Sequence, residues 1–174
     1  MIGLRRKRPR REEILRDFFW PSFLREVQVL GNDLLTGIAR LEARRKDTMG
    51  APGFSVFPSN ENAAPFSGYL EAYDLILEVG RFARYEIYGF GKGGKVVARM
   101  SWQEELRAIW QAIMAGGFRG HLVCDSDGNV VSSKVRISVH GRDMVLSYGG
   151  RLISRFRGRN EKTITYESYL ASTS

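Results

Sequence analysis

The sequence predicts an α+β fold. An N-terminal basic tail and a helical segment precede a compact body, in which an antiparallel sheet packs on one amphipathic helix. The helix is expected at residues 101–115, where apolar side chains recur at helical spacing. Strands are expected at residues 82–90 and 95–100, where aromatic or β-branched residues alternate with other residues. From residue 120 onward, short apolar runs are separated by the turn sequences DSDG, HGRD, YGG and RGRN, as in a meander.

Changes in composition divide the 174 residues into four segments. These are a basic tail over residues 1–13, a helical segment over 14–46, a linker or docking arm over 47–66 and an α+β core domain over 67–174. The hydrophobic share of 43% is enough to fill a core. The single cysteine, Cys124, cannot form a disulfide within the chain, so a reducing compartment is expected.

The helical segment carries an apolar stripe with one interruption. Apolar residues from Ile14 to Phe19 lie at helical spacing, and Pro21 is expected to force Trp20 out of helical geometry before the helix restarts. The stripe then continues through Leu24, Val27, Leu30, Leu34, Ile38 and Leu41. Such a stripe predicts a core or partner contact.

The arm over residues 47–66 contains three prolines and two glycines and has no regular period, which is typical of a linker or a long ordered arm. Phe54 and Phe57 make it apolar enough to dock. We expect it either to mediate self-association on a neighbouring molecule or to fold back onto its own body. The first alternative predicts a homo-oligomer.

The helix at residues 101–115 has both of its ends marked. Ser101 and Glu104 match the Ser-x-x-Glu capping box, and Gly116 and Gly117 stop the helix. Its apolar face consists of Leu106, Ile109, Trp110, Ile113 and Met114. We expect this face to anchor the core, with Trp110 buried.

Positive charge is concentrated at the N-terminus. The chain has 27 Lys and Arg against 19 Asp and Glu, a net charge of +8. Six of these cations are Arg5, Arg6, Lys7, Arg8, Arg10 and Arg11, and without them residues 12–174 carry only +2. A basic tail on a nearly balanced body predicts docking on a polyanion, either nucleic acid or an anionic membrane leaflet. A tail kept for solubility or a nuclear-import address is the alternative.

Two further kinds of residue extend this predicted site. The predicted polyanion-binding site also includes cations outside the tail, namely Lys92, Lys95, Arg155, Arg157 and Arg159. Guanidinium groups among aromatic rings are typical of single-stranded nucleic-acid sites, although alternating Arg and Phe also fits a strand with one face in water. Next to the tail, Phe18, Phe19 and Trp20 are expected to contact a membrane or a partner by shallow insertion.

No motif supports catalysis, a metal or a cofactor. GFGKGGKV has glycine-loop spacing, but a strand is expected after it where a dinucleotide site needs a helix, and the other kinase motifs are missing. DSDGN lacks the Glu at the twelfth position of a calcium loop. His121 and Cys124 would point to opposite faces of a strand. We therefore expect a non-enzymatic protein without metal or cofactor.

In the order of these features the chain resembles rhabdovirus matrix proteins. MIGLRRKR is similar to their short Met-hydrophobic-basic start, FFWPSF to their aromatic-Pro element, and LRAIWQAIMAGG with GFRGHLV to their amphipathic helix, Gly-rich turn and strand. The likeness covers most of the chain in outline, and the Pro-Pro-x-Tyr motif common in that family is absent. It implies a self-associating protein that bridges an anionic inner leaflet and a nucleocapsid. Its place would be the virion, or the host cytoplasm at the inner membrane face.

Two other classes of function stay open at this point. A nucleic-acid-binding protein of a phage or mobile element would use the same tail on phosphates and would be cytoplasmic. A small adaptor or inhibitor would use it on an acidic protein. A polybasic arm binds all of these polyanions, so the sequence does not separate them.

Overall fold

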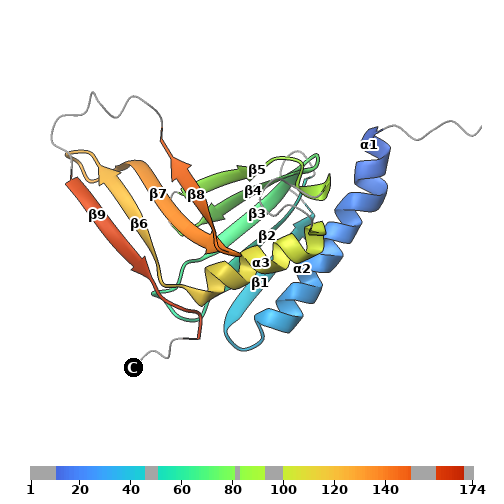
Figure 1. Cartoon of the computed structure of the whole chain (residues 1–174), viewed down its shortest axis with the longest axis horizontal. Helices are drawn as coiled ribbons and strands as arrows, with labels where there is room; N and C mark the ends of the chain where they lie inside the picture. Colours follow the sequence, from blue (N-terminus) through green and yellow to red (C-terminus); the bar gives the residue numbers. More distant parts are fainter. Residues whose placement is uncertain (1–10, 46–50, 81–82, 93–99, 150–159, 171–174) are drawn as a thin grey trace, which may run out of the picture.

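The computed structural model describes residues 11–45, 51–80, 83–92, 100–149 and 160–170 (Figure 1). It confirms the α+β fold. A long N-terminal helix is followed by a five-stranded antiparallel sheet, a second helix and a four-stranded antiparallel sheet.

The N-terminal helix continues through its proline. It consists of α1 (Arg11–Ile14), the π-helical turn η1 (Leu15–Phe19) and α2 (Trp20–Leu34). Trp20 has helical dihedral angles, φ −62° and ψ −43°, so the break expected at Pro21 is wrong. In the wider π-helical turn, the Trp20 N–H donates to the Leu15 carbonyl, which gives the proline ring room. The Ser22 hydroxyl donates to the Phe18 carbonyl at 2.7 Å.

The five-stranded sheet takes its first two strands from segments in which no strand is expected from the sequence. Its strands, in spatial order, are β1 (Ala39–Arg45), β2 (Pro52–Pro58), β3 (Phe66–Glu71), β4 (Asp74–Val79) and β5 (Ala83–Ile87). The helical segment therefore ends at Leu34, not at residue 46, and the arm over residues 47–66 contributes a core strand. Pro52 and Pro58 lie at the ends of β2, where a missing N–H is tolerated.

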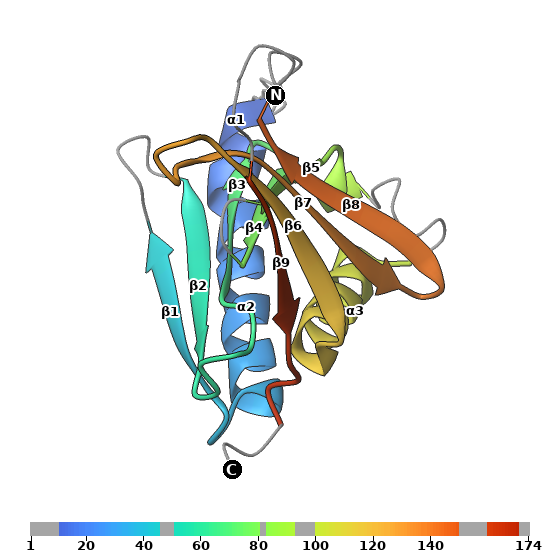
Figure 2. The same ribbon diagram turned by 90° about the vertical axis from the view of Figure 1, so that its left-hand side faces the viewer.

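The four-stranded sheet follows α3 (Trp102–Ala115), which comes after the short 3₁₀ turn η2 (Phe90–Lys92). Its strands are β6 (Phe118–Cys124), β7 (Val130–Val139), β8 (Arg142–Tyr148) and β9 (Asn160–Tyr166), in the order β8-β7-β6-β9. The expected meander is thus β6 to β8, and β9 returns to pair with β6. In Figure 2 this sheet lies in front of α3.

One core joins the N-terminal helix, both sheets and α3. It includes buried residues of η1 and α2, both sheets and α3. Phe23 of α2 and Phe54 of β2 lie in the same cluster as Trp110 of α3. The expected separation of residues 14–66 from the core domain is therefore wrong, because these residues supply one wall of the core.

The capping box of Ser101 and Glu104 is present, as expected.

Candidate polyanion-binding site

Two cations of the predicted set meet over one aromatic ring. The guanidinium carbon of Arg11 lies 5.5 Å from the centroid of the Tyr73 ring, and the Lys92 ammonium nitrogen lies 5.0 Å from it. Both distances are within the range of cation–π attraction. Arg11 and Lys92 are exposed, whereas Tyr73 is half-buried. The ring therefore contacts two solvent-facing positive charges at the start of the N-terminal helix.

Packing between η1 and the β3–β4 turn positions this ring. The Phe19 and Tyr73 ring centroids are 5.2 Å apart, and the Trp20 indole N–H donates to the Ala72 carbonyl at 3.4 Å. On the other side, the Gly91 N–H donates to the Tyr73 carbonyl at 3.0 Å. Gly91 is required at this place because a Cβ there would overlap the Phe19 ring. Three segments distant in sequence thus form the site.

The remaining predicted cations lie outside the described residues. They are Arg5, Arg6, Lys7, Arg8, Arg10, Lys95, Arg155, Arg157 and Arg159. Five of them directly precede Arg11 in the sequence. Within the described residues, Arg11 and Lys92 are the members of the predicted set.

The three aromatic residues expected to contact a membrane or partner have different environments. Phe18 is 66% exposed, and Ile14, one helical turn before it, is 37% exposed. Phe19 is buried against Tyr73 and Trp102, so its expected surface role is wrong. Trp20 is half-buried and bonded to the β3–β4 turn. The side chains available for insertion are therefore Phe18 and Ile14.

The two residues expected to mediate self-association, Phe54 and Phe57, also have different environments. Phe54 is buried in the chain's own core, which makes its expected role in docking on a neighbour wrong. Phe57 lies three residues further along β2, on the opposite face of the strand, and is 38% exposed. The Arg40 guanidinium lies 4.6 Å from the Phe57 ring centroid and covers part of it. Residues 51–58 of the arm therefore fold back onto the chain's own body, which is the second of the two expected alternatives.

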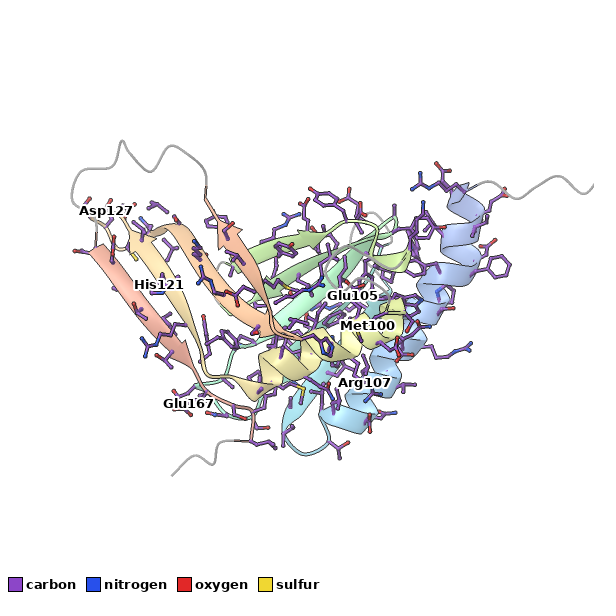
Figure 3. All side chains as sticks on the ribbon, in the orientation of Figure 1. Met100, Glu105, Arg107, His121, Asp127 and Glu167 are labelled. Atoms are coloured by element: carbon purple, nitrogen blue, oxygen red, sulfur yellow. The ribbon has the colours of Figure 1, made fainter. Side chains whose placement is uncertain are left out.

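The remaining candidates from the sequence, a metal site, the His121 and Cys124 pair and the DSDGN turn, can be compared with the described residues. No group of three or more His, Cys, Asp or Glu side chains is placed there to hold a metal. His121 is exposed and Cys124 is buried, on opposite faces of β6. The Asp125 carboxylate accepts from the backbone N–H groups of Asp127 and Asn129, which lowers its pKa and closes the β6–β7 turn. Figure 3 shows Asp127 at this turn.

One buried ionisable group has no sequence signal. Glu105 of α3 is fully buried, and neither carboxylate oxygen has a hydrogen-bond partner within the described part of the chain (Figure 3). Desolvation raises its pKa from 4.5 to about 7. Nothing in the sequence marks Glu105 as buried, because it follows Glu104 in the first turn of the helix, where acidic residues are common.

A second feature missed from the sequence is a groove of mixed polar and apolar lining on the outer face of the five-stranded sheet. Cavities of about 380, 300 and 150 Å³ meet there at Glu78. Arg44 and Arg84 line two of them. Both guanidinium groups already pair with glutamates of their own strands, Glu42 and Glu86. The groove therefore does not add to the cations around Tyr73.

Comparison with protein-family models, curated proteins and solved structures finds no match for this chain. Among the described helices, none combines the length and the apolar character needed to cross a membrane. The convergence of Arg11 and Lys92 on Tyr73 was also missed from the sequence, because it depends on tertiary packing.

Proposed function

We propose that the chain is a non-enzymatic, matrix-like structural protein that adsorbs to an anionic membrane leaflet through its N-terminal region. The observation that carries this proposal is the meeting of Arg11 and Lys92 over Tyr73, where the helix begins directly after the basic tail. The resemblance to rhabdovirus matrix proteins supports the wider role. In that role the protein self-associates and links the inner face of a membrane to a nucleoprotein, in a virion or in the host cytoplasm.

Electrostatic attraction supplies the first part of the binding free energy. Each Lys or Arg near an anionic leaflet contributes about 1 kcal/mol, so the six cations between Arg5 and Arg11 have an upper limit of roughly 6 kcal/mol. Lys92 adds a seventh charge, which contacts the same Tyr73 ring as Arg11. Adsorption of this strength is reversible and weakens as salt increases.

Apolar contact supplies the second part. Ile14 and Phe18 are four residues apart and exposed on the helix that follows the tail. Full burial of one such side chain contributes about 1.5–3 kcal/mol. Cations followed by an exposed aromatic residue on a helix are typical of segments that lie in the membrane interface. This combination favours a lipid surface over a polyanion without an apolar phase.

Vesicle co-sedimentation of the full chain tests the proposal. We expect binding to phosphatidylcholine vesicles that contain phosphatidylserine, no binding to phosphatidylcholine alone, and weaker binding at higher salt. Replacing the six tail cations by Ser should abolish binding and leave the melting temperature unchanged. Phe18→Ser should weaken binding but preserve its salt dependence. Tyr88→Ser is the matched control, since Tyr88 is also exposed, at 64%.

Equal binding to neutral and anionic vesicles would overturn the proposal. So would a tail variant that still binds anionic vesicles as the wild type does. Binding to nucleic acid without any binding to vesicles would instead support the phage-like or mobile-element alternative.

A further inference from the structure

The outer face of the four-stranded sheet, turned away from α3, carries four exposed basic side chains. β6 presents Arg119 and His121, and β7 presents Lys134 and Arg136. The residues between them along each strand are buried, so these four point away from the core. Figure 2 shows this sheet in front of α3, and Figure 3 marks His121 on β6. We call these four residues the basic square.

The strand register places the four side chains close together. His121 lies opposite Lys134, and the same register sets Arg119 opposite Arg136. Opposite residues of an antiparallel pair have Cβ atoms about 4.5–5.5 Å apart, and alternate residues of a strand are about 6.8 Å apart. Like charges directly opposite, as at Arg119 and Arg136, destabilise a sheet. An anion bound over the square would relieve this repulsion.

Neighbouring acidic groups neutralise only part of the square. The Asp143 carboxylate of β8 lies 3.5 Å from Arg136 Nε, and both side chains are more than half exposed. Glu161 of β9 lies opposite Val123, beyond the square. Within the described ranges neither Arg119 nor Lys134 forms an ion pair. Arg119 and Lys134 therefore leave positive charge on this part of the face that no described carboxylate pairs with.

Hydroxyl groups flank the cations on both sides. On β9, Thr165 lies opposite Arg119 and Thr163 opposite His121, with Thr163 Oγ1 3.4 Å from His121 Nδ1. On β8, Ser147 lies opposite Lys134. Arg, Lys, Ser and Thr side chains are the groups that proteins use most to hydrogen-bond phosphate oxygens of a nucleic-acid backbone. The face thus combines charge with neutral phosphate donors.

We propose that the basic square binds the phosphate backbone of duplex nucleic acid. Lys134 and Arg136 on β7, about 6.8 Å apart, with Arg119 on the neighbouring strand, suit successive phosphates of one strand. The described residues of this outer face include no Phe, Tyr or Trp side chain, so the large stacking platforms that single-stranded sites use are missing. Val123 and Val145, the apolar residues next to the basic square, are both half-buried, so no fully exposed apolar side chain lies beside the cations to insert into a lipid surface. Recognition is through the backbone and is independent of base sequence.

This surface is separate from the N-terminal membrane site, and the inference stands without it. The experiment is fluorescence anisotropy of the full chain with a labelled duplex of about 20 base pairs, at several salt concentrations. Because the tail also attracts phosphates, every measurement is repeated with its six cations replaced by Ser. The test variant combines Arg119→Gln, Lys134→Gln and Arg136→Gln. The control combines Arg40→Gln, Arg44→Gln and Arg84→Gln, an equal change of charge on the five-stranded sheet, where each arginine already has a glutamate partner.

The test variant should lose about tenfold or more in affinity in both tail backgrounds. Its slope of log affinity against log salt should fall by about 2–3, since each phosphate contact adds roughly 0.9 for a DNA duplex. The control should change affinity by no more than about twofold. Arg119→Lys with Arg136→Lys should largely restore binding. Melting temperatures should stay constant, because all substituted side chains are exposed or half-exposed.

Equal losses in the test and control variants would overturn the proposal, because they would reveal only long-range charge. An unchanged salt slope in the test variant would also overturn it. A loss of vesicle binding without a loss of duplex binding would assign the square to a membrane instead. Failure of the tail to bind vesicles contradicts the proposed function alone and leaves this inference intact.

Discussion

The Phe54 ring lies 5.0 Å from the Trp110 indole, measured between centroids, and both side chains are buried. This contact joins β2, within the segment expected to be an arm, to α3, the helix expected to anchor the core. The Phe66 ring lies 5.3 Å from the same indole in an edge-to-face arrangement. Such pairs add to the free energy of simple burial. The buried Trp110 side chain therefore holds the arm to the rest of the body.

Trp110→Ala is expected to lower the free energy of unfolding by about 3–5 kcal/mol, because it leaves a cavity between Phe54 and Phe66. Urea unfolding followed by circular dichroism measures this loss. Trp110→Phe should cost clearly less, since it keeps a ring and removes the indole N–H, which has no partner in the described structure. The control Tyr88→Ala removes an exposed ring. Unchanged stability of Trp110→Ala would show that this side of α3 is a partner surface.

Phe54→Ser and Phe57→Ser should have different effects, although the two residues are three apart on one strand. Phe54→Ser puts a hydroxyl among core rings and should cost at least about 2–4 kcal/mol in unfolding free energy. Phe57→Ser affects a partly exposed ring under Arg40 and should cost about 1 kcal/mol or less. Sedimentation velocity of Phe57→Ser then tests assembly in a folded chain. A wild-type oligomer that Phe57→Ser converts to a monomer would restore a docking role for β2.

Helix α3 could be predicted from the sequence because its signals are local. The capping box, the apolar face and the glycine stop all lie within 17 residues, and the structure has each of them. Strand β5 and the strands β6 to β8 were predictable from alternation for the same reason, whereas the strand expected at residues 95–100 lies outside the described residues. Strand β1 was not, because ARLEARR consists largely of helix-favouring residues, and its extended form depends on seven pairs with β2.

The candidate site was predictable only in part, because it depends on contacts between distant segments. The cations of the tail are visible in the sequence, but Arg11 and Lys92 meet only after the helix packs on the β3–β4 turn. Likewise, alternation in FRGHLVC and SKVRISV indicates an exposed row of basic residues on each strand. Placing the two rows side by side requires the register of β6 and β7.

Gly91→Ala should disturb the N-terminal site without unfolding the sheets. A Cβ at Gly91 would overlap the Phe19 ring, which also packs on Tyr73 and Trp102. We expect faster amide hydrogen exchange in residues 11–20 and a loss of about 1–3 kcal/mol in unfolding free energy. Gly89→Ala is a control for backbone strain alone, since Gly89 has φ +66° but no atom within 4 Å of the position that a Cβ would take. Equal exchange in both variants would show that Gly91 does not position the helix.

The buried carboxyl of Glu105 should make stability fall as pH rises. Its pKa in the folded chain is raised from 4.5 to about 7 by desolvation, so between these values the folded state binds more protons than the unfolded state. The contribution of the neutral carboxyl is fully present below about pH 4.5 and is lost as pH rises through about 7. A loss of about 2–3 kcal/mol is expected across this window.

Urea unfolding of the wild type and of Glu105→Gln at pH 5, 6, 7 and 8 isolates this contribution, because the other titrating groups are common to both chains. The amide has nearly the same shape and cannot ionise, so the variant should gain stability relative to the wild type as pH rises, and most at pH 8. Glu104 provides an opposite control. Its carboxylate accepts hydrogen bonds from the Ser101 backbone and hydroxyl, which lower its pKa, so its contribution is lost only on acidification below about pH 4.5. The difference in stability between wild type and Glu104→Gln should therefore stay constant from pH 5 to 8. A difference between wild type and Glu105→Gln that does not change with pH would show that Glu105 ionises freely in the folded chain.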